Sequence, residues 1–209
     1  MISLTRQMII NDDLGGFNRI AQMLGRAAAR TVGNDVYSVI NTNGNMSDGN
    51  PIFHANHSNL AGAGAAPTVI TVGAGRAAMR KQMDLSGLDY LDIRPAVFLV
   101  PVALEDTENV LVASETDPGQ ANSRKPNAIR GFAEVVSDPR LDATSATAWY
   151  LVASPSLAPL IEVAFLDGNQ TPFLESENGF TIDGVRWKVR LDYGTAAIDW
   201  RGGYKNAGA

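Results

Sequence analysis

The stretch Arg-Pro-Ala-Val-Phe-Leu-Val-Pro, residues 94–101, is the clearest structural signal in the sequence. Five apolar residues lie between its two prolines, and a short continuous run of this kind is typical of a strand buried on both faces. Leu104, Val110 and Leu111 follow at spacings that favour a helix. A strand followed directly by a helix that packs back on it predicts a sheet with helical cover.

Upstream of this stretch the sequence predicts one strand and two helices. Apolar residues alternate well enough over 2–10 to predict a strand. Between 14 and 28 they recur every three or four residues, which predicts a long helix. Gly33 favours an end to that helix, with a second helical run over 36–40 after a kink. A further helix is expected over 71–83.

Two polar stretches predict exposed loops. Residues 41–50 contain four asparagines and two glycines, the residue types that favour turns. Residues 115–130 are rich in proline, glycine, asparagine and serine. Both stretches separate regions of regular apolar patterning, so we expect them to connect elements over the surface.

The last third of the chain predicts mainly strands, over residues 132–136, 149–153, 161–166, 179–182 and 185–191. Asp183 and Gly184, between the last two, form a two-residue hairpin signal. In the final strand apolar residues alternate with Arg186, Lys188 and Arg190. That strand therefore has one apolar and one basic face, and the basic face is a hypothetical nucleic-acid surface.

Composition excludes several classes of protein. The 209 residues include no cysteine, which rules out disulfides, thiolate nucleophiles, zinc fingers and iron–sulfur ligation. The net charge of -5 argues against a dedicated nucleic-acid binder, since such proteins cluster cations against phosphates. The longest apolar runs are far shorter than the ~20 residues of a membrane-spanning helix, so we expect no contact with a membrane.

The only histidines, His54 and His57, raise the possibility of a metal-dependent enzyme. A helical zinc site needs a third ligand and usually a glutamate after the first histidine, whereas position 55 is alanine. A structural turn is the favoured interpretation. The glycines at 72–75 lack the third glycine of a dinucleotide loop, since residue 78 is alanine. The residues predict no catalytic, cofactor-binding or metal site.

Motifs along the chain carry a resemblance to a known family. They lie at residues 5–14, 53–60 (Phe-His-Ala-Asn-His-Ser-Asn-Leu), 77–82, 93–101, 140–142 and 149–153. The most specific motifs are C-terminal, at residues 178–180, 183–185, 188–190, 197–202 (Ala-Ile-Asp-Trp-Arg-Gly) and 204–208. By these motifs, in this order, the chain resembles the Mu-type major head proteins of tailed phages and the capsid part of prohead protease/major capsid fusion proteins.

The resemblance implies an α+β fold of the Hong Kong 97 capsid type, in which a peripheral domain holds a spine helix and a long sheet. An axial domain holds a mixed sheet flanked by helices. On this basis residues 1–95 are mainly peripheral, 96–166 mainly axial, and 167–209 a C-terminal hairpin and tail, again mainly peripheral. Family members also carry an N-terminal arm and an extended hairpin ahead of the motif that starts at Thr5. Met1 is four residues before it, so we expect those parts to be absent.

The function implied is that of a structural subunit, not an enzyme, which self-assembles through pentamers and hexamers into an icosahedral shell around a phage or prophage genome. Its partners would be copies of itself, other phage head proteins and, non-specifically, packaged DNA. It would be found in the virion capsid, and in the host cytoplasm during assembly. A shell protein of a capsid-like nanocompartment is the alternative. No cofactor is implied.

Contacts between subunits are expected at loops 41–66 and 115–130. The candidate contact residues are Arg6, Asn45, Asp48, Arg124, Lys125, Arg186, Lys188 and Arg190.

Overall fold

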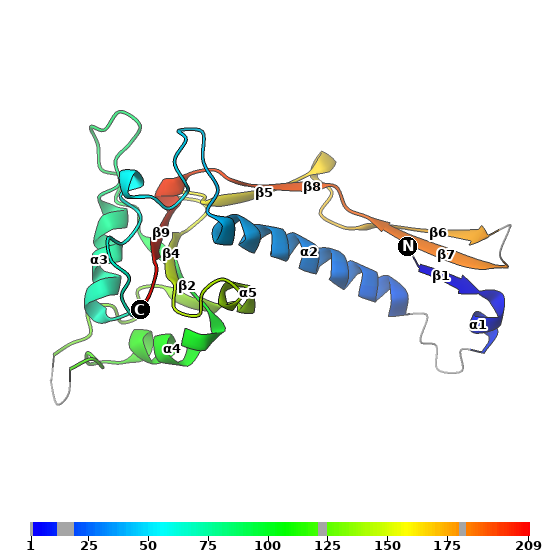
Figure 1. Cartoon of the computed structure of the whole chain (residues 1–209), viewed down its shortest axis with the longest axis horizontal. Coiled ribbons are helices and arrows are strands. Elements are labelled where there is room, and N and C mark those ends of the chain that lie inside the picture. Colours follow the sequence, from blue (N-terminus) through cyan, green and yellow to red (C-terminus); the bar gives the residue numbers. More distant parts are fainter. Residues whose placement is uncertain (1, 12–18, 121–124, 180–182) are drawn as a thin grey trace. The chain divides into compact units, whose positions relative to one another are not determined.

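A computed structural model describes residues 2–11, 19–120, 125–179 and 183–209 (Figure 1). The chain divides into two compact units. Unit 1 comprises Met1–Val36 and Val163–Thr195, and unit 2 comprises Tyr37–Glu162 and Ala196–Ala209. These units are defined by contacts within the chain, so the peripheral and axial ranges expected from the resemblance stay a prediction.

Unit 1 contains an antiparallel sheet in the order β1-β7-β6. Its strands are β1 (Ile2–Thr5), β6 (Phe173–Gly179) and β7 (Gly184–Arg190). The strand predicted over 2–10 is therefore too long, because the chain enters helix α1 (Arg6–Ile10) after Thr5. Thr5 pairs with Gly184, the first residue of β7, so the partner strand ends there and no ladder is left to extend.

The C-terminal hairpin exists, and its first strand begins at Phe173, six residues before the predicted start at Gly179. β6 and β7 pair from Phe173 with Arg190 to Gly179 with Gly184, whereas the strand was predicted at 179–182. Residues 180–182 lie outside the described residues. Gly184 belongs to β7, so Asp183-Gly184 is not the two-residue turn that its sequence suggests. The polar run after Leu174 gives β6 no apolar alternation, and for that reason it escaped detection.

The long helix α2 (Ile20–Thr42) runs for 23 residues without interruption. The kink predicted at Gly33 is wrong, and the part of the prediction over 14–18 lies outside the described residues. A glycine inside a helix costs only about 1 kcal/mol relative to alanine, and the apolar residues on either side of it favour continuation. The helix ends at the asparagine-rich stretch, as turn chemistry there predicts.

Unit 2 is built on a mixed four-stranded sheet in the order β3-β2-β4-β9. Its strands are β2 (Pro95–Val100), β3 (Glu134–Ser137), β4 (Trp149–Ala153) and β9 (Gly203–Asn206). β2 and β3 are parallel, and the other neighbours are antiparallel. Helix α4 (Glu105–Ala113) belongs to the crossover that the parallel pair requires. The predicted strand and helix that follow Arg94 are thus confirmed.

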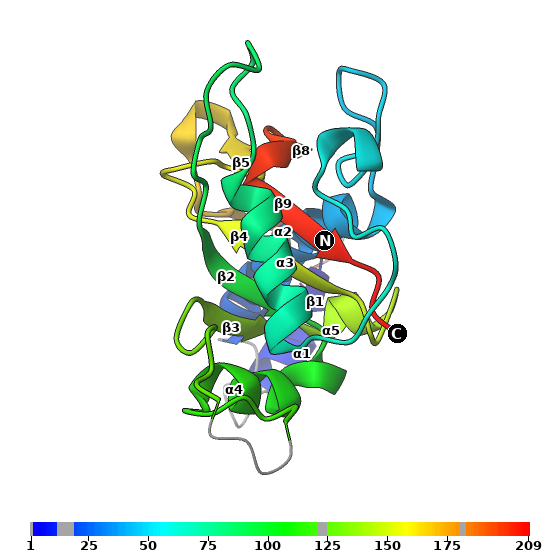
Figure 2. The ribbon, with the colours of Figure 1, turned by 90° about the vertical axis from the view of Figure 1, so that its left-hand side faces the viewer.

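Both faces of this sheet are buried, which confirms a mixed α+β architecture. Phe98 and Trp149 belong to a core with α3 (Val69–Arg80) and α4, and Figure 2 shows α3 in front of the strands. Their sequence neighbours Leu99 and Tyr150 belong to a second core on the opposite face.

Helix α3 begins two residues earlier than predicted, because Thr68 and Thr71 form a reciprocal capping box. It packs so closely on the sheet that a Cβ at Gly75 would lie 2.8 Å from Tyr204 and 2.9 Å from Leu151. The close packing explains a glycine that helix propensity alone disfavours.

The remaining elements are short. They are α5 (Pro139–Asp142), β5 (Ile161–Phe165), β8 (Tyr193–Ala197) and the 3-10 helices η2 (Ala55–His57), η3 (Val102–Leu104), η4 (Leu166–Gly168) and η5 (Trp200–Gly202). β5 and β8 pair as a two-stranded ribbon. Among the described helices, none has the length and apolar character to cross a membrane.

Candidate functional site

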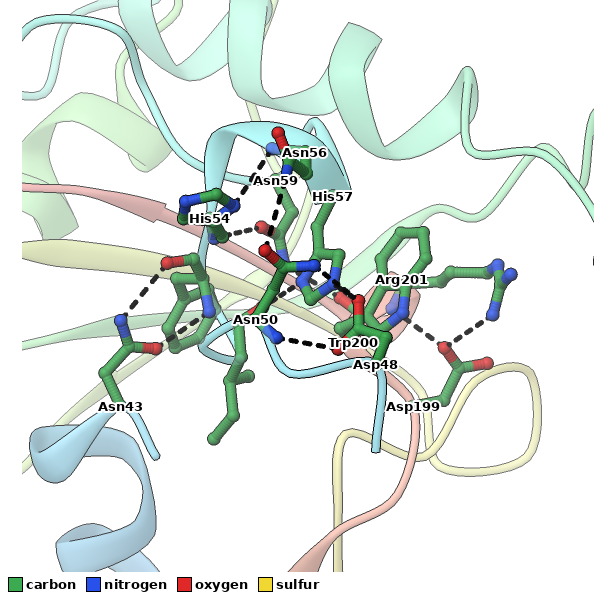
Figure 3. A network of polar contacts seen from close by, with 12 residues as sticks. Asn43, Asp48, Asn50, His54, Asn56, His57, Asn59, Asp199, Trp200 and Arg201 are labelled. Carbon is green, nitrogen blue, oxygen red and sulfur yellow. Dashed lines mark hydrogen bonds and ion pairs between the residues drawn. The ribbon is translucent and has the colours of Figure 1, made fainter. Parts of the chain in front are cut away.

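His57 is the centre of a polar network in unit 2 (Figure 3). Its side chain is only 3% exposed. Nδ1 lies 3.0 Å from the carbonyl oxygen of Ile52, and Nε2 lies 2.7 Å from Oδ2 of Asp48. Carbonyl and carboxylate oxygens only accept hydrogen bonds, so the ring makes both bonds only when both nitrogens carry protons. Hydrogen bonds from Asn50 and His57 hold the pKa of Asp48 well below its ordinary value.

The imidazole also stacks on Trp200, the first residue of η5 (Trp200–Gly202). The two rings are nearly parallel, at 3°, with centroids 4.4 Å apart. The guanidinium carbon of Arg201 lies 4.3 Å from the same indole ring. The indole is therefore covered by the imidazole and also contacts a guanidinium, whose charge the electron-rich ring stabilises. Arg201 Nε donates in addition to the carbonyl oxygen of Met83, 2.8 Å away.

Asn59 ties three segments of backbone to this centre and is fully buried. Its Nδ2 donates to the carbonyl oxygens of Ile52 at 2.9 Å and Trp200 at 3.0 Å, and its Oδ1 accepts from the backbone N–H of His54 at 3.0 Å. A buried amide with this many partners is a positioning element, because each bond satisfies a backbone group that would otherwise be buried unpaired.

The network fixes the base of the asparagine loop, the name used here for residues 43–52. Asn43 bonds the backbone of Phe53 in both directions, with Oδ1 accepting at 2.8 Å and Nδ2 donating at 3.1 Å. Within the loop, Met46 N–H donates to the carbonyl of Asn50 at 2.8 Å. The loop predicted over 41–50 is confirmed from residue 43 on, since α2 includes residues 41 and 42. It has a defined path because Asn43 bonds the backbone of Phe53 and the loop carries backbone hydrogen bonds of its own.

A second loop, here called the leucine loop, comprises residues 83–91 and starts at the same network. Gln82 just before it donates from Nε2 to the carbonyl oxygen of His57 at 2.9 Å. Inside the loop, Oδ1 of Asp84 accepts from the backbone N–H of Leu88 at 3.0 Å. Figures 1 and 2 show both loops projecting from one end of unit 2. One network thus holds two exposed loops in place.

The loop residues predicted as contacts have different surroundings. Asn45 and Asp48 lie exposed in the asparagine loop, and Asp48 is bound to the network as described. Lys125 is exposed, and its carbonyl accepts from the backbone N–H of Asp117 at 3.0 Å. Arg124 lies outside the described residues. The sequence therefore located the asparagine loop but did not indicate that Asp48 is held by a buried histidine.

The basic face of β7 is largely neutralised by its neighbour in unit 1. Arg186 pairs in register with Glu177, and Lys188 with Glu175. Residues directly opposite in an antiparallel pair share a face, and Lys188 forms an ion pair with Glu175. The acidic partners were missed because β6 was placed elsewhere.

The two remaining candidate cations also have acidic partners. Arg190 Nε lies 3.2 Å from Asp192 Oδ2. Arg6 lies 3.5 Å from Asp183, and its backbone N–H donates to the Asp183 carbonyl at 2.8 Å. Both pairs are exposed, where such contacts contribute little to stability and their partners can exchange.

The metal hypothesis is not supported by these contacts. Both nitrogens of His57 are hydrogen-bonded to acceptors, so the ring offers no lone pair to an ion. His54 Nδ1 accepts from the backbone N–H of Asn56 at 3.2 Å and thereby caps η2. Across the ranges that the structure describes, no group of three acidic, cysteine or histidine side chains has the arrangement of a metal site.

Comparison with known proteins identifies the family. The model of a family described as phage capsid protein matches residues 1–206. A comparison with curated proteins finds no match. Among solved structures, the chain is similar to a chain in a satellite phage P4 procapsid including size determination (Sid) protein, with 12% identity and a TM-score of 0.34. The match covers 66% of this chain and 37% of that one. Because the family model extends over nearly the whole sequence, the chain belongs to the phage capsid protein family, a family of structural proteins.

Proposed function

We propose that this protein is a major capsid subunit that self-assembles through pentamers and hexamers into an icosahedral phage or prophage head. The observation that carries the proposal is the phage capsid family match over residues 1–206. Within that family we place the chain with the Mu-type head proteins and the Hong Kong 97 fold, on the motifs quoted above. The peripheral and axial domains over 1–95, 96–166 and 167–209 belong to the same proposal, as does enclosure of the genome.

The polar network supports a structural function. Its buried side chains are hydrogen-bonded to backbone groups and to other side chains, as the contacts of His57 and Asn59 show. Such groups are not available to bind or activate a substrate. What they achieve is to hold two exposed loops in fixed positions, which is the requirement for a surface that must meet another subunit in one orientation.

We propose eight charged and amide residues as contacts between subunits. They are Arg6, Asn45, Asp48, Arg124, Lys125, Arg186, Lys188 and Arg190. Exposed ion pairs such as that of Arg6 with Asp183 are cheap to break, because water already screens them. Their partners can be exchanged for those of a neighbouring copy at little cost.

Light scattering on a size-exclusion column, with negative-stain microscopy of the same fractions, tests the function. Rings or closed shells are expected, since capsid subunits associate through repeated heterologous contacts. A 22.2 kDa monomer at every concentration, alone and with the other head proteins of its phage, would contradict it. Nuclease-protected DNA in the shells supports a phage head, whereas a packaged protein supports the nanocompartment alternative.

A further inference from the structure

The tip of the leucine loop is apolar and acidic. Leu85 is 95% exposed and Leu88 81% exposed. The aspartates at 84 and 89 flank them, and neither carboxylate has a basic partner among the described residues. Asp84 holds the turn in one conformation, because it accepts from the hydroxyl of Ser86 and from backbone N–H groups of the turn. An exposed apolar cluster on an ordered loop marks an interaction surface.

The base of the same loop is basic. Arg80 and Arg94 lie on its two sides and share one acid, Asp92, as their ion-pair partner. The two arginine side chains are 51% and 71% exposed. Lys81 is exposed as well, and within the described part of the chain its amino group has no acidic partner. Three cations therefore meet a single acid at the base, whereas the tip has acids only.

A pocket of about 460 Å³ lies at this base, lined by Ala77, Arg80, Lys81, Tyr90 and Asp92. It combines apolar surface, from the alanine and the tyrosine ring, with cations. The tip carries the complementary pair, since Leu88 is followed directly by Asp89. A leucine that enters this pocket gains an apolar contact while the carboxylate beside it meets opposite charge.

We propose that the leucine loops of two copies pair side by side in opposite directions, so that the tip of each docks into the basic pocket at the base of the other. The inference rests on the proposed function, which supplies the second copy. Charge sets the direction, because a parallel pair would oppose acid to acid at the tips and cation to cation at the bases. The two copies use the same surface, which makes the contact isologous.

Charge disfavours three other pockets as the docking site of this acidic tip. One, in unit 1, is lined by two aspartates and by Arg190, which already pairs with Asp192. A second, in unit 2, is lined by Asp106 and Asp117 and by no cation. The groove beside the asparagine loop has an uncharged lining, but the 42% exposed Asp48 directly follows one of its lining residues. Each of these places like charge near the tip, whereas the pocket at the loop base offers opposite charge.

Engineered cysteines test the geometry of the pairing, since the chain has none of its own. Leu88→Cys and Ala77→Cys proteins of different mass are mixed under mild oxidation, so that a tip docked in the pocket forms a disulfide between two chains. The mixed dimer is expected in at least tenfold excess over that from Leu88→Cys with Leu157→Cys. Leu157 is also exposed, at 53%, but lies outside the pocket. Equal yields from the two mixtures would overturn the pairing.

Charge reversal tests the attraction. Lys81→Glu and Asp89→Lys each place like charges at both ends of the two-fold contact, so each variant is expected to need at least tenfold more protein for assembly. The double variant Lys81→Glu/Asp89→Lys should assemble as the wild type does, because opposite charges face each other again. Glu162→Lys is the control, since it makes the same change of charge at an exposed position outside the loop. All four proteins should keep the wild-type melting temperature.

The two readouts separate this inference from the proposed function. If the wild type forms shells and the single reversals do so equally well, or if the double variant is not rescued, the pairing is wrong and the capsid function stands. If the disulfide between tip and pocket forms while no ring or shell ever appears, the pairing stands and the capsid function fails. No disulfide together with no assembly contradicts both.

Discussion

Oδ2 of Asp48 lies 2.7 Å from Nε2 of His57, and this contact joins an exposed loop to a buried imidazole. The histidine side chain is 3% exposed, whereas that of the aspartate is 42% exposed. Loss of either partner leaves the other without its hydrogen bond, and the effect is larger when the buried partner remains, because water cannot replace the lost contact.

Replacing His57 by alanine is expected to lower the free energy of unfolding by about 2–3 kcal/mol, since a stacked ring and two hydrogen bonds are lost from a buried site. Chemical denaturation followed by tryptophan fluorescence measures the change. His54→Ala is the matched control, because His54 contributes one cap to a single-turn helix and its loss should cost about 1 kcal/mol or less. Equal losses of unfolding free energy in the two variants would show that the contacts of His57 stabilise the protein no more than the helix cap made by His54.

Glu108 of α4 predicts a pH dependence of stability. The side chain is fully buried, and within the described part of the chain neither carboxylate oxygen has a hydrogen-bond partner. Burial raises its pKa from 4.5 to about 7, so the folded state binds this proton more tightly than the unfolded state. The associated stability is complete below pH 4.5 and is lost as the pH rises through 7, by about 3 kcal/mol in total.

Denaturation of the wild type and of Glu108→Gln at pH 5 and pH 8 isolates this contribution. The wild type should lose more stability between the two pH values than the variant, whose side chain does not titrate. A difference between the proteins that stays constant with pH would mean that Glu108 is ionised in the folded state.

The acidic partners on β6 predict weak binding to DNA. With Glu175 and Glu177 beside Lys188 and Arg186, the face carries little net charge. At physiological salt the wild type should bind duplex DNA no more tightly than the weakest non-specific proteins, with a Kd of about 100 µM or above. Glu175→Gln/Glu177→Gln should bind at least fivefold more tightly and with a steeper salt dependence. Fluorescence anisotropy across a salt series measures both, and tight wild-type binding would refute the neutralisation.

Two glycines in α3 should respond oppositely to alanine. A Cβ at Gly75 would press on Tyr204 and Leu151, so Gly75→Ala is expected to cost about 2 kcal/mol despite the better helix propensity. A Cβ at Gly73 meets nothing within 4 Å, and Gly73→Ala should therefore stabilise the protein by roughly 0.5–1 kcal/mol. Thermal unfolding compares them, and stabilisation by both would mean that the contact between α3 and the sheet is looser than described.

Local sequence patterns correctly predicted the elements whose residues carry a clear apolar pattern of their own, such as β2 and the helix after it. The apolar run at β2 and the helical spacing after it were sufficient, because burial on both faces leaves an unbroken apolar signal. The kink at Gly33 was wrong because a small propensity cost does not end a helix whose neighbours favour it. β6 escaped because its polar residues are specified by the partners on β7, and a strand defined by its partners lacks a pattern of its own.

The site was predicted only in part. The asparagine-rich stretch correctly indicated turns, and a structural histidine was the favoured interpretation of His57. The stacking of His57 on Trp200 and the bond from Gln82 to the His57 carbonyl join segments far apart in sequence. Contacts of that kind leave no local signature in one sequence, so Trp200 and Gln82 were missed.

Because β9 is the last strand in the sequence and lies at the edge of the unit 2 sheet, this sheet is completed only at the end of synthesis. β4 obtains its second neighbour, and His57 its stacking partner Trp200, only after residues 200–206 have been synthesised. Because chains are made from the N-terminus at about 5–20 residues per second, a nascent subunit spends several seconds with β4 lacking its second neighbour and with the His57 ring lacking the indole on which it stacks.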